Sequence, residues 1–310
     1  MNAEQNSEIW NRLIQGMPLE GLGLGERHGR LDLKGLRGLE PFVSNTIHTP
    51  VGDAAVLGGL TKLRGAAWKS LDFSGSRLND LKFFDSTISD CVFDKCRCRN
   101  WGLWGTKVSD TSFRSANLRE SALGGVAPGT WNTFLRVDFT AADLRGTAYG
   151  SPEFVGCTFK DTRLAKVDFD GSRFTDCSFK GELKEVCFNR TSFMKGLEDF
   201  PPNEMLRVDL SHAQLRDVEF RELDLETVKF PADADHIVLE NYPDTLDRLI
   251  EAFKGQTGLG SRGFAAYLAC YRKWAGPRQK RGVLNKKDVL GMVGEEGLRR
   301  TEEIVESNRG

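Results

Sequence analysis

The chain has 310 residues, of which 39% are hydrophobic and 28% are charged, and its formal net charge is -1. This composition is typical of a soluble globular protein with one large domain or two smaller ones, and it excludes a disordered chain. A net charge near zero excludes a general electrostatic affinity for nucleic acid, and no apolar run is long enough for a membrane span. The N-terminus lacks a signal-peptide pattern and the seven cysteines form no CxxC pair, so we expect a cytoplasmic protein with reduced thiols.

The first sixty residues are expected to form an N-terminal cap for the structure that follows them. Their clearest element is SEIWNRLIQ at 7–15, which is typical of an amphipathic helix with Ser7 as N-cap and Gly16 as C-cap. One face of this helix is apolar and consists of Trp10, Leu13 and Ile14. The segment LDLKG at 31–35 is a lone copy of a five-residue unit that recurs from residue 61.

Between residues 61 and 230 large apolar residues recur every five positions. An α-helix has 3.6 residues per turn and a strand has a period of two, so neither accounts for this spacing. The stretch RVDFTAADLRGTAYG at 136–150 shows the period. Thirty-one centre positions are apolar, Phe193 among them, and fifteen of the twenty phenylalanines occupy such positions. The residue two before each centre is usually small, and the other three are polar or Gly.

We interpret the period of five as a solenoid. Each unit forms one side of a square coil, so that four units close a turn of about twenty residues and the large and small residues both point inward. Coils then stack at roughly the 4.8 Å spacing of adjacent strands. Residues twenty apart should therefore lie in one inward column, as for Phe139, Phe159 and Phe179. By the same spacing Cys157 and Cys177 should be buried, reduced neighbours.

Units such as ANLRE (116–120), ADLRG (142–146) and VDFDG (167–171) resemble the pentapeptide-repeat family, whose units read A(D/N)LXX. The resemblance covers about residues 61–230 and implies an all-β solenoid, a right-handed quadrilateral β-helix. Four large residues at the small site depart from the pattern, and either the coil widens there or the side chain turns outward: Leu71, Leu81, Trp101 and Leu223. Trp101 with the nearby Trp104 indicates either an exposed aromatic patch or a packed corner, and we favour the corner.

The repeat is interrupted at 124–131 and at 194–207, and it loses one residue of phase near Gly181. These interruptions are either neutral insertions or recognition loops that project from a rigid rod. Some members of the family that protect DNA topoisomerases carry loops that break the coil in this way. The candidate recognition residues in the second loop are Glu198, Asp199, Phe200 and Glu204.

Residues 231–310 are expected to form a C-terminal helical region, with helices at 243–253, 261–274 and 294–306. Residues 208–247 hold eleven acids and three bases, whereas 252–287 hold nine bases and no acid. The basic stretch is either a nucleic-acid or acidic-partner site, with candidate residues Arg272, Lys273, Arg278, Lys280 and Arg281, or a segment that folds back on the acidic end coil. We favour the second interpretation, made in the same chain or between subunits of a homodimer.

No motif predicts catalysis, a cofactor or a metal. The stretch GLGSRG at 258–263 matches GxGxxG but follows a helix instead of a strand, and the four histidines are scattered. Cys91, Cys96 and Cys98 indicate core packing more than a metal site. The sequence therefore predicts a non-catalytic interaction scaffold for an unidentified protein partner.

Two alternatives remain. One is protection of a DNA topoisomerase (gyrase) by mimicry of DNA, although residues 61–230 carry 25 bases and 25 acids and thus no excess of acid. The other is nucleic-acid binding through the basic C-terminal segment.

Overall fold

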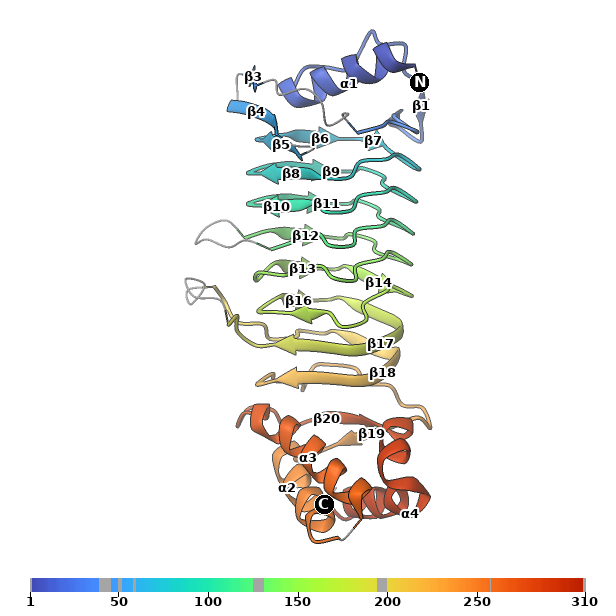
Figure 1. The fold of residues 1–310 in the computed structure, drawn as a ribbon, viewed down its shortest axis with the longest axis vertical. Coiled ribbons are helices and arrows are strands. Elements are labelled where there is room, and N and C mark those ends of the chain that lie inside the picture. The colour runs from blue at the N-terminus through green and yellow to red at the C-terminus, as the bar shows by residue number, and fades with distance from the viewer. Residues whose placement is uncertain are drawn as a thin grey trace.

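The computed structural model describes residues 2–38, 46–49, 52–57, 60–124, 131–193, 200–256 and 258–308. Figure 1 shows three parts along the long axis of the molecule: a helix at the N-terminal end, a stack of short strands, and a group of helices at the C-terminal end. Within the described ranges, no helix is both long and apolar enough to cross a membrane.

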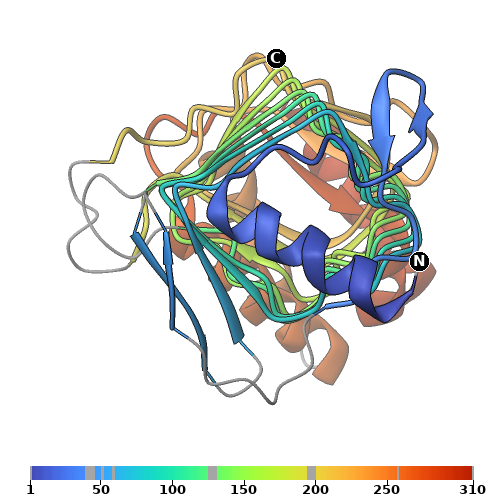
Figure 2. The ribbon, with the colours of Figure 1, turned by 90° about the horizontal axis from the view of Figure 1, so that it is seen from above.

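Helix α1 (Ala3–Gln15) lies across the first coil, as the view along the stack in Figure 2 shows. Its N-cap is Asn2, whose side chain accepts a hydrogen bond from the Gln5 N–H at 2.8 Å. The expectation that Ser7 is the N-cap is wrong, because the helix begins one turn earlier and the Ser7 hydroxyl donates to the Ala3 carbonyl. Gly16 is the C-cap, with a left-handed φ of 65°. The apolar face predicted for this helix is buried.

Most strands of the stack are two to four residues long. One sheet contains β3 (Thr46–Thr49), β4 (Gly52–Leu57), β5 (Leu60–Arg64), β8 (Leu81–Phe84) and β10 (Gly102–Trp104). A second contains β6 (Ala67–Lys69), β9 (Thr87–Ser89), β11 (Lys107–Ser109), β12 (Thr133–Leu135), β13 (Glu153–Val155) and β16 (Arg173–Thr175). The other strands of the stack are β1 (Glu26–Arg27), β2 (Arg30–Asp32), β7 (Leu71–Asp72), β14 (Thr158–Lys160), β15 (Asp168–Phe169), β17 (Ser178–Asn189) and β18 (Asp209–Arg221).

The regular register between stacked strands is twenty residues. Ile88 pairs in parallel with Val108, and Phe154 pairs in the same way with Phe174. Each turn of the chain therefore closes after four five-residue units and lies on the turn before it, as the superposed coils in Figure 2 show. The period of five arises from this geometry, because one unit forms one side of a coil.

The core of the stack is a set of aromatic columns. The rings of Phe139, Phe159 and Phe179 stack with centroids 5.1 and 4.6 Å apart, as the spacing predicts. Every centre position named by the period is buried except Phe193, which is 57% exposed. The prediction that Phe193 points inward is wrong. The chain leaves the coil there, and Met205 takes the inward place.

The four large residues at the small site all point inward, so the outward alternative is wrong. Leu71, Leu81, Trp101 and Leu223 are each at most 5% exposed. The Trp101 indole N–H donates to the Leu78 carbonyl, and the Trp104 ring stacks on Phe84 at 4.8 Å. Trp101 is thus packed inside the coil, as expected, whereas Trp104 lies partly exposed against Phe84.

The coil begins upstream of residue 61. Leu31 pairs in parallel with Leu71, and Arg37 pairs with Arg77, forty residues later. The lone unit at 31–35 is therefore part of the first rung. The antiparallel pair β3–β4 lies within the longer connection that follows it.

The C-terminal region has a core of its own. It consists of β19 (His236–Leu239), α2 (Tyr242–Lys254), α3 (Leu259–Trp274), β20 (Gly282–Asn285) and α4 (Lys286–Ser307). Helices α2 and α3 match the predicted ranges within three residues, and α4 starts eight residues early because Asn285 caps it ahead of a kink at Gly294. The antiparallel pair β19–β20 was not predicted.

Candidate interaction surface

Both interruptions of the repeat enter the stack at the same corner. Val108 pairs with Phe134 after 26 residues and Thr175 pairs with Leu206 after 31, instead of the regular twenty. Both partners belong to one continuous series of rungs, since β12 pairs with β13 and β13 with β16 (Figure 1). The two insertions thus lie three rungs apart on one edge of the rod, or roughly 14 Å at the ordinary strand spacing.

Two aromatic rings connect these insertions. Trp131, which ends the first insertion, meets Phe200 of the second edge to face, with ring centroids 5.3 Å apart. The Arg173 guanidinium lies 6.0 Å from the centroid of the Phe200 ring, within range of a cation–π interaction. Phe200 is 9% exposed, whereas Trp131 is 43% exposed. We call Trp131, Phe200 and Arg173 the loop clasp. It joins two segments seventy residues apart into one surface.

A buried asparagine fixes the end of each insertion. Asn132 is fully buried; its side-chain oxygen accepts from the Thr106 N–H, and its amide donates to two backbone carbonyls. Asn203 is also fully buried and accepts from the N–H groups of Phe174 and Met205. These side-chain amides bind backbone groups that lose their regular partners on the adjacent rung where the chain is inserted. They therefore hold the ends of both insertions, and with them the loop clasp, in fixed positions.

The structure assigns different roles to the residues predicted for recognition. Glu198 and Asp199 lie outside the described residues. Phe200 is packed inside the loop clasp, and Glu204 forms an ion pair with Arg190 at 2.8 Å. The exposed residue is Trp131, which lies in a predicted interruption but was not among the predicted recognition residues. An asparagine at an inward small position, as at 132, is the signal that could have found the anchor.

The beginning of the second insertion contacts the C-terminal region. Phe193 meets Trp274 of α3 edge to face at 5.7 Å, and the Arg221 guanidinium lies 4.9 Å from the centroid of the Trp274 ring. The second insertion therefore links the loop clasp to the helical end of the molecule.

The basic segment folds back on the acidic segment of the same chain. Arg272 pairs with Asp247 of α2 at 2.9 Å, and Arg281 pairs with Glu240 at 3.1 Å. The expectation that Arg272 reaches carboxylates of the end coil is wrong, because α2 lies between them in the chain and supplies the nearer acid. The remaining candidates are exposed and have no ion pair among the described residues: Lys273, Arg278 and Lys280.

Side chains from the C-terminal region cap the last coil. The Leu215 N–H donates to His236 Nε2 at 3.0 Å, and the Asp217 N–H donates to the Asp288 carboxylate at 3.1 Å. The Tyr271 hydroxyl donates to Asp217 at 3.1 Å, and burial raises the pKa of Tyr271 well above its ordinary value, which keeps this donor protonated. A strand edge left open would pair with another chain, so these contacts within one chain protect the end of the stack.

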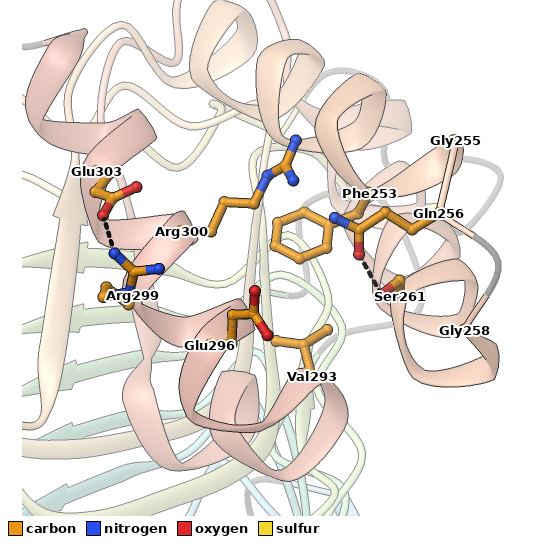
Figure 3. Close-up of a pocket in the computed structure, with 11 residues that line it drawn as sticks. Phe253, Gly255, Gln256, Gly258, Ser261, Val293, Glu296, Arg299, Arg300 and Glu303 are labelled. Atoms are coloured by element: carbon orange, nitrogen blue, oxygen red, sulfur yellow. Dashed lines mark hydrogen bonds and ion pairs between the residues drawn. The ribbon is translucent and has the colours of Figure 1, made fainter.

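The glycine-rich stretch at 258–263 borders a cavity of about 730 Å³ between α2, α3 and α4 (Figure 3). Two pairs of polar side chains around this cavity contact each other. Ser261 donates to Gln256 at 2.7 Å, and Arg299 pairs with Glu303 at 3.0 Å. Gly260 approaches the Met292 carbonyl so closely that a side chain would clash there. That glycine therefore has a role in the packing of α3 against α4.

The family model described as "Pentapeptide repeats (8 copies)" matches residues 153–181. These residues lie in the regular part of the stack, where the register is twenty residues and the centre positions form aromatic columns. This part of the chain is built of pentapeptide repeats. No curated protein matches the chain in sequence.

Several solved structures of pentapeptide-repeat type are similar to the chain at low identity. Full-length QnrB1, a plasmid-mediated fluoroquinolone resistance protein, is 16% identical over 65% of this chain and 93% of its own, with a TM-score of 0.25. HetL, a pentapeptide-repeat protein involved in heterocyst differentiation regulation in the cyanobacterium Nostoc, is 15% identical over 55% of this chain and 83% of its own, with a TM-score of 0.17. TM-scores this low establish no common arrangement over the whole length, so the family assignment depends on the repeat itself.

Proposed function

We propose that this pentapeptide-repeat protein is a non-catalytic interaction scaffold of the cytoplasm, which presents the loop clasp to a protein partner on a right-handed quadrilateral β-helix. The observation that carries the proposal is the contact between Trp131 and Phe200. It brings both interruptions of an otherwise regular rod to one place and leaves the Trp131 ring 43% exposed. Tryptophan and arginine are enriched among the residues that dominate binding energy at protein interfaces.

The experiment is affinity capture from lysate of the source cell with three forms of the protein. The Trp131→Ala variant removes the exposed ring of the loop clasp. The Trp104→Ala variant is the matched control, because Trp104 is a partly exposed tryptophan on the same rod whose ring stacks on Phe84 and not on the loop clasp. A protein retained by the wild type and by Trp104→Ala, but lost with Trp131→Ala, supports the proposal. Identical captured proteins for all three forms contradict it.

Gyrase protection by mimicry of DNA is the alternative that the family resemblance suggests. The largest acidic excess lies in residues 208–247, and several of these acids pair with bases of the same chain, among them Asp235, Glu240 and Asp247. This arrangement favours the scaffold over the mimic. A supercoiling assay with gyrase and a quinolone separates them, since only a mimic should protect the enzyme.

Nucleic-acid binding through the basic C-terminal segment is the second alternative. Five of the nine bases in residues 252–287 are held by carboxylates, Arg272 and Arg281 among them. This leaves four bases without an ion pair among the described residues: Arg262, Lys273, Arg278 and Lys280. With more than half of its bases neutralised within the chain, this segment is a weaker candidate than the continuous basic run in the sequence suggests.

A further inference from the structure

One face of the stack carries arginines directly above one another. Arg37 pairs in parallel with Arg77, and Arg77 pairs with Arg97, so the three occupy equivalent positions on consecutive rungs. All three are exposed, and none has a carboxylate partner among the described residues. We call Arg37, Arg77 and Arg97 the arginine ladder. At the ordinary strand spacing it is about 10 Å long.

Many charged side chains of the rod pair with an opposite charge on the adjacent rung. Asp110 binds Arg136 through two hydrogen bonds, and Asp176 binds Arg207 in the same way. Further pairs of this kind are Arg64–Asp85, Arg99–Glu120, Arg114–Asp138 and Arg173–Glu153. Like charges directly opposite in a sheet are destabilising. Like charges also lie on adjacent rungs at Lys62–Lys82 and Lys160–Lys180, but the arginine ladder extends such a stack over three rungs.

Three acids close to the ladder in the sequence or on the next rung are engaged by other groups. Glu120 accepts two hydrogen bonds from Arg99, and Asp80 accepts one from the Asn100 amide. Asp94 accepts from the Ser112 hydroxyl. The positive charge of the ladder is therefore left for a ligand from outside the chain.

We propose that the arginine ladder binds the phosphate backbone of double-stranded nucleic acid without reading its sequence. Guanidinium groups match phosphate geometry, and identical donors repeated along a line fit a polymer whose anions also repeat along a line. The described part of this face exposes no aromatic ring for stacking, which single strands require. It also exposes no apolar side chain that could anchor a folded protein partner.

The test is fluorescence anisotropy of a labelled 20-base-pair DNA duplex at 50 to 300 mM KCl. Three phosphate contacts predict a slope of about -2.7 in log K against log salt, and thus about a forty-fold loss of affinity between 50 and 200 mM. The Arg37→Gln/Arg77→Gln/Arg97→Gln variant should bind at least about tenfold more weakly and lose most of this slope. Arg97→Gln alone should reduce the slope by about 0.9, which keeps the test valid if the triple variant does not fold.

The matched control is Lys69→Gln/Lys107→Gln/Lys160→Gln, which removes the same charge from three exposed positions away from the ladder. It should keep both the affinity and the salt slope of the wild type. The proposal is overturned if the wild type does not bind the duplex at 50 mM salt, or if both triple variants lose binding equally. It is also overturned if polyglutamate of equal charge competes as well as the duplex, since the site would then recognise an acidic protein.

Discussion

The replacement Phe159→Ala tests the packing of the coil most directly. The Phe159 side chain is 1% exposed and stacks between two rings at centroid distances of 5.1 and 4.6 Å. Removing a buried phenylalanine costs about 3–5 kcal/mol. The backbone hydrogen bonds of adjacent rungs hold the neighbouring rings in place, so the cavity cannot collapse. Each lost aromatic pair adds about 0.5–1.5 kcal/mol, and the expected loss is therefore at the upper end, about 5 kcal/mol.

The assay is denaturant unfolding followed by far-UV circular dichroism, with Phe193→Ala as the control. Phe193 is 57% exposed and has one ring contact, so its replacement should reduce the free energy of unfolding by less than about 1 kcal/mol. Equal losses for the two variants, or a loss below about 2 kcal/mol for Phe159→Ala, would refute the account of the core.

Three further predictions concern the thiols, acid and the end of the stack. Maleimide should label Cys270 rapidly in the native protein but not Cys157 or Cys177, because Cys270 is exposed and the other two are buried; rapid labelling of a buried thiol contradicts this. Hydrogen bonds from Arg136 outweigh desolvation and lower the pKa of Asp110. Ion pairs such as Asp110–Arg136 should therefore stabilise the fold fully above about pH 5, and this stabilisation should be lost as the pH falls below about 4. A melting temperature that stays constant down to pH 3 argues against it. Deletion of residues 241–310 should leave the coil folded but associating end to end in size-exclusion chromatography, since the Asp288 and Tyr271 contacts that cap its last strand are lost; a soluble monomer with unchanged melting is the opposite result.

The repeat made most of the stack predictable, because one period decides which residues point inward and which pair after twenty residues. The interaction surface was only partly predictable. The positions of both interruptions follow from the change in phase, but the contact between Trp131 and Phe200 depends on both entering at one corner. That depends on how many residues each insertion adds, which the phase alone does not reveal. That Met205 and not Phe193 fills the inward position was missed for the same reason, because it depends on the number of residues in the second insertion.

The C-terminal region was predictable in its helices but not in its strands. Strands β19 and β20 are four residues each, and their sequences give no period long enough to read. The pairing of Arg272 with Asp247 was likewise missed, because the charge counts show that two segments attract each other but not which side chains meet.

The stacking of identical rungs makes the distance between the two insertions adjustable in fixed steps. Each coil contacts only the coils on either side of it, so a block of twenty residues can be removed without changing which side chains face inward. Deleting residues 139–158 would bring the two insertions closer by one rung, about 4.8 Å, with both still at the same corner. A lineage of such proteins could therefore match partners of different size by gaining or losing whole coils, with no redesign of the core.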